Sequence, residues 1–436
     1  MHFPSMNSSM IRKGTAMKKT RIYLRIVSLF LVCAVTLPMT GCSMTVQAKD
    51  LMDGITPNEV RSPEDLSAQN ALATDLALRL MAASEKSGEN TLISPLSVLC
   101  ALAMTMNGAE GETLRQMEAV LGMTPEEANL YLYSYLKSLP LDEKNQLNLA
   151  NSIWFTDDGH FTVKRDFLQT NADYYGADIF EAPFDAGTCK EINHWVKGKT
   201  DGMIPEILDR IPPEAVMYLV NALAFEAEWA VTYENDQVKS GEFTKEDGTR
   251  QDAKFMYGSE STYLEDEKAT GFMKYYSGCK YAFVAMLPNE GVSVSDYIAS
   301  LDGETLHALL SAPQYTPVLS AIPKFQTAYT TEMSAILGEL GMPEAFDPDN
   351  AEFASLGASA EGNLYISRVL HKTFISVAEQ GTKAGAATVI GIANKGAAPD
   401  PETPKQVYLD RPFVYMLVDC ENHIPFFIGT MMDMKG

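Results

Sequence analysis

The sequence predicts an α+β fold, with one large domain over residues 62–436. Apolar residues at helical spacing dominate the first half of this range, and apolar runs typical of strands alternate with helical patterns in the second half. No internal repeat and no change of composition divides the range. With 46% hydrophobic and 21% charged residues, the chain of 436 residues has the composition of a folded globular protein.

Two helices are predicted near the start of the domain. The segment Ser62–Asp65 is a typical helix start, because it offers a capping serine, a proline for the first turn and acids for the helix dipole. Leu72, Leu76 and Leu80 then mark one buried helical face. A second helix is predicted to begin at Ser94-Pro95 and to continue through Met106.

Strands and a further helix are predicted in the later part of the domain. The continuous apolar run Tyr281–Leu287 is typical of a buried strand. Apolar residues within Met333–Leu340 have helical spacing, and Gly341 ends that helix. Two strands, Phe413–Val418 and Phe426–Met431, are predicted to be joined by a short polar turn.

Residues 1–41 are typical of an export signal. A basic start precedes an apolar run that is shorter than the roughly 20 residues of a membrane-spanning helix. Met17 opens a more typical signal than Met1, which leaves the true start open. The end of the run, Met39-Thr40-Gly41-Cys42, resembles the bacterial lipobox, which predicts Cys42 as a lipid attachment site. The alternative is a plain secretory signal with an incidental cysteine.

Charge and location follow from this signal. Lipid on Cys42 would anchor the protein stably to a membrane of the cell envelope, on the extracellular face or in the periplasm, with residues 42–61 as a polar tether. Loss of residues 1–41 leaves 28 basic and 57 acidic residues, a net charge of about −29. Such acidity argues against binding to nucleic acid.

The cysteines exclude some classes of metal site. Beyond the signal and Cys42, the chain contains Cys100, Cys189, Cys279 and Cys420, widely spaced and without a C-x-x-C motif. Zinc-binding and thioredoxin-like interpretations therefore fail, and the sequence predicts no metal site and no cofactor. Cys100 lies in an apolar helical pattern and is expected to be buried, whereas disulfide pairing stays open.

The segment Gly381–Lys405 breaks the pattern of the domain, because it is rich in glycine, proline and small residues and lacks a large apolar face. We expect a long exposed loop with a function, although a low-complexity linker is the alternative. Read as a strand, the start of the loop has two unlike faces. One face is uncharged and has small or β-branched side chains: Thr382, Ala384, Ala386, Thr388, Ile390 and Ile392. The opposite face contains the one charge, Lys383, and consists of Gly381, Lys383, Gly385, Ala387, Val389, Gly391 and Ala393.

The start of this loop resembles the reactive-loop hinge of the serpin family. The match consists of Glu379, Gln380, Gly381, Thr382, Lys383, Ala384, Gly385, Ala386, Ala387 and Thr388. Further motifs of the family occur in the correct order over almost all of residues 62–436: Asn90–Ser97, Ile192–Val196, Thr200–Ile204, Asn221–Trp229, Ile322–Phe325, Val369–Lys372, Arg411–Phe413 and Phe427–Gly429. The chain is therefore identified as similar to serpins.

The resemblance implies a fold of three β-sheets and about nine helices, with an exposed reactive loop over about residues 379–411 and a main sheet that opens to admit it. It also implies two clusters, one under that sheet and one where insertion begins. A shutter cluster would comprise Ser94, Ser97, Asn221 and His371, and a breach cluster would comprise Trp229, Lys324 and Glu379, with a Lys324–Glu379 pair. The simpler interpretations are a satisfied core histidine for His371 and core packing for Trp229.

Counting along the loop from Gly381 to the cleavage position of the family reaches Lys395, followed by Gly396. A lysine there suits trypsin-like serine proteases, whose specificity pocket contains a carboxylate. The segment Gly396–Arg411 is longer than in typical members, so the bond at Asn394 or a neighbouring bond is the alternative. Glu226 and Ala227 also depart from the family pattern before Trp229.

The resemblance implies a monomeric suicide-substrate inhibitor that forms a covalent complex with its protease and is not itself an enzyme. Catalytic motifs such as G-x-S-x-G, H-E-x-x-H or a P-loop do not occur in the sequence. Two alternatives remain: a non-inhibitory member that acts as a carrier or chaperone, and an inhibitor of a cysteine protease. Uncharged Thr382, Ala384 and Ala386 favour inhibition, because they permit insertion of the loop.

Overall fold

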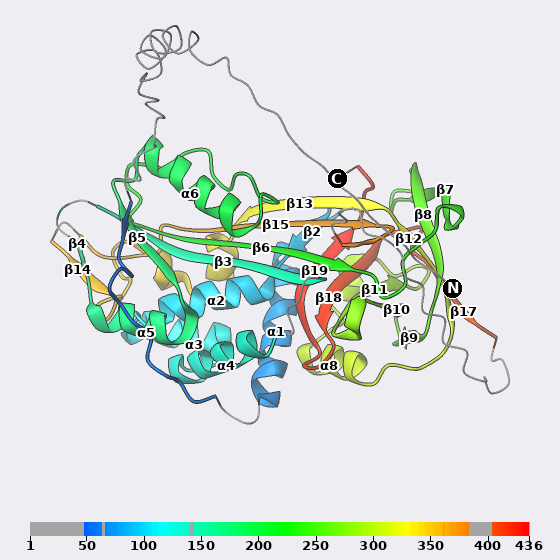
Figure 1. The fold of residues 1–436 in the computed structure, drawn as a ribbon, viewed down its shortest axis with the longest axis horizontal. Coiled ribbons are helices and arrows are strands. Elements are labelled where there is room, and N and C mark those ends of the chain that lie inside the picture. Colours follow the sequence, from blue (N-terminus) through cyan, green and yellow to red (C-terminus); the bar gives the residue numbers. More distant parts are fainter. Residues whose placement is uncertain are drawn as a thin grey trace, which may run out of the picture. The chain divides into compact units, whose positions relative to one another are not determined.

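The computed structural model describes residues 48–62, 66–139, 144–157, 159, 161–360, 362–382 and 403–435. These residues form a mixed structure of helices and sheets, which confirms the α+β prediction (Figure 1). The described residues contain nine α-helices: α1 (Ser67–Ser84), α2 (Pro95–Met106), α3 (Gly111–Leu121), α4 (Pro125–Ser138), α5 (Arg165–Tyr175), α6 (Ala186–Lys199), α7 (Val294–Ile298), α8 (Gly303–Ser311) and α9 (Ser334–Glu339).

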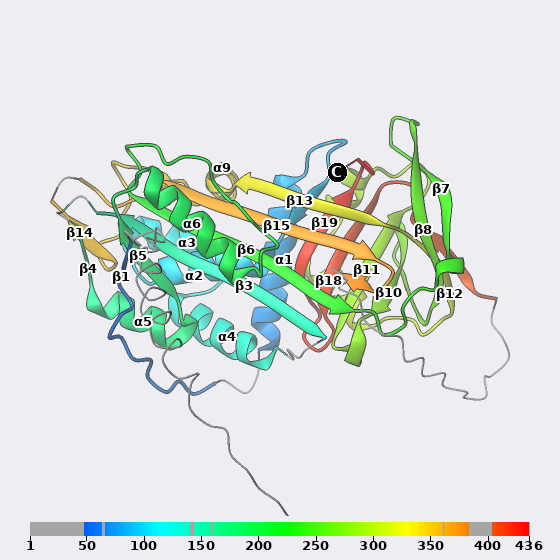
Figure 2. The same cartoon turned by 45° about the horizontal axis from the view of Figure 1, so that its top comes forward.

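The largest sheet, called sheet A below, has seven strands in the described residues. Their spatial order is β1 (Lys49–Asp50), β5 (Asp178–Ala182), β3 (Asn145–Thr156), β6 (Met217–Glu228), β16 (Gly381–Thr382), β15 (Arg368–Ala378) and β13 (Phe325–Glu332). The long strands β3, β6, β15 and β13 lie side by side (Figure 2). They form the layer on which the rest of the domain is arranged.

Sheet A is buried on both faces along β6, as the near-continuous apolar sequence of this strand requires. Tyr218 and Val220 pack with α6 on one face, and α2 lies on the other face (Figure 1). On the α2 side, Leu219, Leu223 and Phe225 join the main core. Successive residues of β6 therefore alternate between two apolar environments.

Three smaller sheets complete the described structure. Sheet B has the order β2 (Thr91–Ile93), β19 (Ile424–Met431), β18 (Phe413–Asp419), β11 (Tyr281–Pro288), β10 (Ala269–Tyr275) and β9 (Thr262–Glu265). Sheet C has the order β17 (Lys405–Tyr408), β12 (Val318–Pro323), β8 (Arg250–Glu260) and β7 (Val238–Thr244). The third is a two-stranded ladder, in which β14 (Gly357–Ser359) pairs with β4 (Phe161–Val163). The three predicted sheets are present, together with this additional two-stranded ladder.

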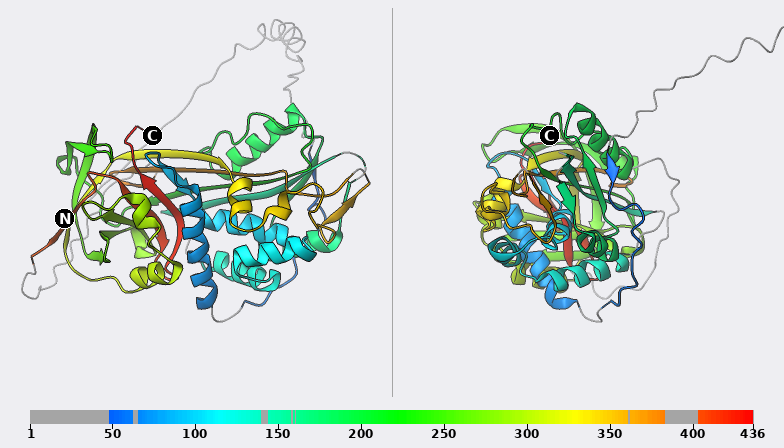
Figure 3. Two further views of the ribbon diagram at one scale, coloured as in Figure 1. Left: turned by 180° about the vertical axis from the view of Figure 1, so that it is seen from behind. Right: turned by 90° about the vertical axis from the view of Figure 1, so that its left-hand side faces the viewer.

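Most of the elements named from sequence patterns occur where predicted. The strand expected at Tyr281–Leu287 is β11, and all its residues are buried. Helix α2 begins at Pro95, and the Ser94 side chain caps it by accepting a hydrogen bond of 3.2 Å from the Ser97 N–H. The two predicted C-terminal strands are β18 and β19, and α1 lies beside β19 in the view from behind (Figure 3).

The predicted start of the first helix was wrong. Helix α1 begins at Ser67, and Leu66 at its N-cap makes no side-chain capping hydrogen bond. Ser62 lies before the helix, and Pro63–Asp65 lie outside the described residues. Leu76 and Leu80 are fully buried, but Leu72 is only partly buried against the core.

The chain enters the folded unit earlier than the residue 62 expected from the sequence. Lys49 and Asp50 of β1 pair with Glu181 and Phe180 of β5. The Leu51 N–H then donates to the Ile179 carbonyl at 2.9 Å. Residues 48–61 of the expected tether thus include a strand of sheet A. This strand could not be predicted, because two residues are too few to show a hydrophobic pattern. Signal residues 1–41 and Cys42 lie outside the described residues, and no helix within the described ranges is long and apolar enough to cross a bilayer.

Candidate functional site

The first residues of the hinge are already paired within sheet A. Strand β16 lies between β6 and β15 and is antiparallel to both, with Thr382 opposite Ala227 and Val377. Gly381 has a φ of 155°, and a Cβ atom there would overlap the carbonyl oxygen of Ala227. Only glycine fits this position, because its neighbour's backbone occupies the space of a side chain. The end of sheet A that contains β16 is called the hinge end below.

Backbone carbonyl groups just before β16 are bound by a turn that follows β6. The Trp229 N–H donates to the Gln380 carbonyl at 2.9 Å, and the Tyr233 N–H donates to the Glu379 carbonyl at 3.0 Å. The Trp229 indole N–H donates to the Ala378 carbonyl at 2.8 Å. These three hydrogen bonds fix the backbone at the point where the chain leaves β15 and enters the hinge.

The structure places Lys324 and Glu379 in contact, as the resemblance implied. The Lys324 ammonium donates to the Glu379 carboxylate at 2.6 Å, and both side chains are partly exposed. Burial acts to raise the pKa of Glu379, but the hydrogen bond from Lys324 and its positive charge outweigh burial and lower that pKa. Glu379 is therefore ionised near neutral pH and ties β15 to the residue between β12 and β13.

Thr382 is fully buried, and its hydroxyl is hydrogen-bonded to the hydroxyl of Tyr276. The Tyr276 ring stacks on the Trp229 ring, with centroids 4.4 Å apart and planes inclined by 13°. Burial raises the pKa of Tyr276 well above its usual range, so its hydroxyl keeps its proton. Tyr276 thus gives the first inward-facing residue of the hinge a polar partner inside the core.

A row of three polar side chains crosses sheet A below the hinge end. Asn151 of β3 is opposite Asn221 of β6, and Asn221 is opposite His371 of β15. The first turn of α2 lies against this row: the Ser97 hydroxyl donates to Asn151 Oδ1 at 3.2 Å and lies 3.4 Å from Asn221 Oδ1. The four residues expected in the shutter cluster therefore lie together, with Asn151 as a further member.

His371 is neutral, and its hydrogen bonds define its tautomer. The Ser94 N–H lies 3.1 Å from Nε2, so Nε2 is the acceptor. Nδ1 then has the proton and donates to Asn221 Oδ1. Complete burial lowers the pKa of His371 from 6.5 to about 3, because the charged form would lose its hydration.

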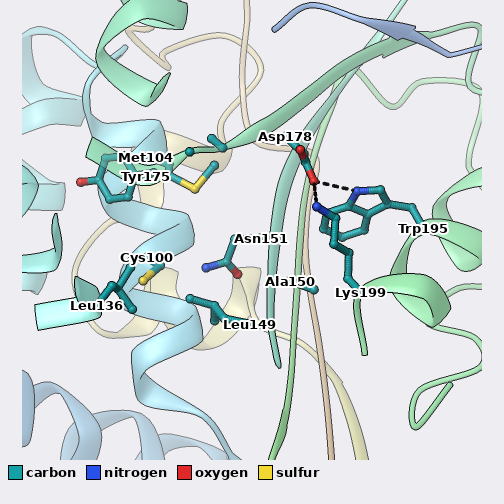
Figure 4. A pocket seen from close by; sticks show the side chains of 12 residues that line it. Cys100, Met104, Leu136, Leu149, Ala150, Asn151, Tyr175, Asp178, Trp195 and Lys199 are labelled. Atoms are coloured by element: carbon teal, nitrogen blue, oxygen red, sulfur yellow. Dashed lines mark hydrogen bonds and ion pairs between the residues drawn. The ribbon is translucent and has the colours of Figure 1, made fainter. Parts of the chain in front are cut away.

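The polar row has unused hydrogen-bonding capacity. The side-chain nitrogens of Asn151 and Asn221 are buried and have no hydrogen-bond partner among the described residues. Beside Asn151 lies a cavity of about 80 Å³, shown in Figure 4 between Cys100 on the α2 side and Asp178 at the other wall. Asp178 accepts hydrogen bonds from the Trp195 indole at 3.0 Å and from Lys199 at 2.5 Å. The cavity therefore lies beside one of these unpaired donors, Asn151, at strands β3 and β5 of sheet A.

Several predicted site residues belong to segments that the structure does not describe, and the others are described as follows. Lys383–Thr388 of the hinge, the predicted reactive bond Lys395–Gly396 and the lipid site Cys42 lie outside the described residues. The described cysteines Cys100, Cys189, Cys279 and Cys420 are free thiols. Among the described residues, no three histidine, cysteine or acidic side chains are grouped as a metal site would require.

Sequence reasoning missed Asn151, Tyr276 and Tyr233. Asn151 could have been identified from the sequence. It is a polar residue on the same inward-facing side of its strand as the apolar Leu147 and Leu149. Tyr276 and Tyr233 could not, since each contacts the hinge through a turn whose course depends on the tertiary fold.

A family model described as Serpin (serine protease inhibitor) matches residues 67–434. An uncharacterized serpin-like protein of Thermococcus kodakarensis is 29% identical over 380 residues, which cover 85% of this chain and 86% of that protein. The leukocyte elastase inhibitor of Equus caballus is 29% identical over 376 residues, covering 81% of this chain and 95% of the inhibitor.

Two crystal structures of a thermophilic serpin, tengpin, are similar to this chain. The native state has a TM-score of 0.85 at 48% identity and covers 89% of this chain and 100% of tengpin. The latent state has a TM-score of 0.76 at 47% identity, with 86% and 100% covered. The arrangement described here is therefore more similar to the native form than to the latent form.

Proposed function

The chain belongs to the serpin family, whose model matches residues 67–434, and we propose that it is an inhibitory member that traps a trypsin-like serine protease. The observation that supports this most is the two-residue strand β16, which already separates β6 from β15 at the hinge end of sheet A. A loop whose first residues occupy the gap between two strands is positioned to extend that strand after cleavage.

The register of β16 predicts where each further residue would insert. Thr382 pairs with Ala227 and Val377, and each later residue would pair one position further down both strands. Continued six residues, this register brings Thr388 between Asn221 and His371. Thr388 would then replace their hydrogen bond and offer its hydroxyl oxygen to the unpartnered amide nitrogen of Asn221.

The same register explains the two unlike faces of the loop. Thr382 points into the core, so residues in step with it, among them Ala384, Ala386 and Thr388, would also point inward. Lys383 lies on the opposite face and would reach solvent. Every inward position is therefore small or β-branched and free of charge, as an interior strand requires.

Insertion would exchange one ladder for two. Strands β6 and β15 now pair in parallel over Tyr218–Ala224 and Arg368–Phe374, and a full-length insert would form antiparallel ladders with both. About a dozen inserted residues at ~0.5–1.5 kcal/mol per hydrogen bond amount to about a whole domain's stability of ~5–15 kcal/mol. The uncut form is thus held by a kinetic barrier.

The proposed reaction begins as ordinary proteolysis. The serine hydroxyl of the protease attacks the carbonyl carbon of Lys395, the amino group of Gly396 leaves, and an ester joins the two proteins. Insertion then moves the protease away before water cleaves the ester. The displaced protease loses the geometry of its triad and oxyanion hole, on which deacylation depends steeply. Each molecule is consumed once, so the chain is an inhibitor and not an enzyme.

Mixing the protein with trypsin tests this proposal. We expect a complex that survives SDS, because the ester is covalent. Replacing the buried Thr382 with arginine (Thr382→Arg) should convert the inhibitor into a substrate that is cut without forming the complex, since the core at Tyr276 has no room or partner for a charge.

The matched control is Lys383→Arg, which changes the outward face and should leave complex formation intact. Stable complexes with Thr382→Arg would refute insertion as the trapping step. A gel with chymotrypsin-like and cysteine proteases alongside trypsin would identify a different target class, and cleavage without any complex would favour the carrier alternative.

We further propose that the mature protein is exported and lipid-anchored through Cys42, which supports an extracytoplasmic target. The lipobox-like Met39–Cys42 and the preceding signal pattern are the basis of this proposal. Replacing Cys42 with serine should move the protein from the membrane fraction to the soluble fraction. An unchanged distribution would rule out the lipid anchor.

A further inference from the structure

The turn Trp229–Tyr233 binds the hinge backbone but is itself poorly covered. Its N–H groups at Trp229 and Tyr233 donate to the carbonyls of Gln380 and Glu379. At its tip, the Val231 side chain is 72% exposed. The position of these two donors therefore depends on contacts made from beneath the turn.

Lys274 provides such contacts from the end of β10. Its ammonium group donates to the Val231 carbonyl at 3.1 Å and lies 3.4 Å from Glu260 Oε1. The same ammonium lies over the rings of Tyr233 and Trp229, 4.3 and 5.3 Å from their centroids. One buried cation thus contacts the first, middle and last residues of the turn.

The pair of Lys274 and Glu260 is almost completely enclosed, with side chains only 4% and 9% exposed. Burial lowers the pKa of Lys274, and the negative charge of Glu260 acts to raise it. Glu260 is held in turn by the Ser320 hydroxyl at 3.1 Å. The anchor therefore extends from β12 and β8, through Glu260 and Lys274, to the turn.

A buried ion pair is costly to desolvate and contributes little net stability compared with apolar residues of the same size. Aromatic faces and a carbonyl around the ammonium offset part of that cost, because a desolvated cation is attracted to a ring face. Such a pair fixes geometry more than it stabilises the fold. The geometry fixed here is that of the donors to the hinge.

We propose that Lys274 is a positioning residue, which holds the turn Trp229–Tyr233 so that its N–H groups bind the hinge carbonyls of Glu379 and Gln380. The contacts stand independently of inhibition, and only their effect on trapping rests on the proposed function. Without this anchor, the turn would be held less firmly, and the carbonyls of Glu379 and Gln380 would be bound less tightly at the point where insertion starts.

Hydrogen exchange of the native full-length protein tests the proposal without any protease. In Lys274→Met, which keeps an unbranched side chain of nearly the same length but removes the charge, the Trp229 and Tyr233 amides should exchange on the order of tenfold faster than in the unaltered protein. Lys274→Arg should restore most of the protection, because it keeps a cationic donor.

The matched control is Lys405→Met. Lys405 also lies over a tyrosine ring, 4.9 Å from the centroid of Tyr263, and 4.0 Å from a carboxylate, but it does not contact the turn. Replacing Lys405 should leave the exchange rates of the Trp229 and Tyr233 amides unchanged. If Lys274→Met does not fold, Glu260→Gln should show a smaller acceleration at the same amides. Unchanged exchange, or equal exchange in the methionine and arginine variants, would overturn the proposal.

An inhibition assay separates this inference from the proposed function. A loosened turn should raise the number of inhibitor molecules consumed per trypsin molecule by several-fold, because slower insertion gives water more time to cleave the ester. Faster amide exchange in a protein that traps no protease would support the positioning role and refute the inhibitory function.

Discussion

His371 combines a titratable group, complete burial and a place between two strands that the proposed loop insertion would separate. Its Nε2 accepts from the Ser94 N–H and its Nδ1 donates to Asn221, so the neutral ring connects α2, β15 and β6. Protonation would remove the acceptor at Nε2 and bury a charge with no acid beside it in the row. Stability should therefore respond to this one residue.

We predict a loss of stability in acid that depends on His371. Because its folded pKa of about 3 lies below the unfolded value of 6.5, its contribution is complete above pH 6.5 and is lost as the pH falls toward 3. At about 1.4 kcal/mol per pKa unit, this contribution reaches about 5 kcal/mol. Urea unfolding midpoints measured between pH 7 and pH 4 give the slope.

His371→Gln should flatten that slope, whereas His194→Gln, at an exposed histidine, should not change it. A residual slope is expected from His423, whose pKa is lowered by burial and by the nearby His307. An acid response that is equally steep in His371→Gln would contradict the assignment.

At the scale of elements, a row of polar side chains crosses sheet A where the proposed insertion would separate its strands. The row Asn151, Asn221 and His371 replaces apolar packing with hydrogen bonds at the same level of three adjacent strands. Such bonds contribute less when intact than their loss costs, because an unpaired buried group has no water to replace its partner. In the proposed mechanism, the inserted strand would therefore have to supply new partners to these groups as the sheet opens.

Asn151 should contribute to closing this row. Asn151→Ala removes an acceptor of the Ser97 hydroxyl and leaves it the longer contact with Asn221, so we expect a loss of about 1 kcal/mol in the free energy of unfolding. Asn148→Ala is the control, because it lies on the opposite face of β3. Equal effects of the two substitutions in urea unfolding would contradict the role of Asn151.

Elements with strong local patterns were predictable. The capped start of α2, the apolar strand β11 and the inward parity of the hinge, seen at Thr382, all follow from periodicity and capping chemistry. The start of α1 was not predictable. The sequence at Ser62 has the residues of a helix cap, but tertiary packing overrides this local preference and the helix begins at Ser67.

Contacts between distant parts of the chain could not be predicted from the sequence. Strand β1 has two residues and no periodicity, and its pairing with β5 depends on where the fold places that edge. Likewise, nothing local indicates that Tyr276 meets Thr382 or that Lys274 lies under Tyr233. Family resemblance supplied the shutter and breach residues, and the structure added the partners that surround them.

At the scale of the whole molecule, the proposed trapping mechanism requires a fold that is not at its lowest free energy. Of the loop residues that the structure describes, Gly381 and Thr382 lie between β6 and β15, and the register of β16 would allow further residues to follow along both strands. The polar row and the inward position of Thr382 are both consistent with a sheet that accepts one more strand.

The most direct test compares thermal unfolding of the intact protein with that of protein cut in the loop by a catalytic amount of trypsin. Insertion adds hydrogen bonds along two strands, so the cut form should melt more than about 10 °C above the intact form. Equal or lower melting of the cut form would contradict the claim that the released loop becomes a strand of sheet A.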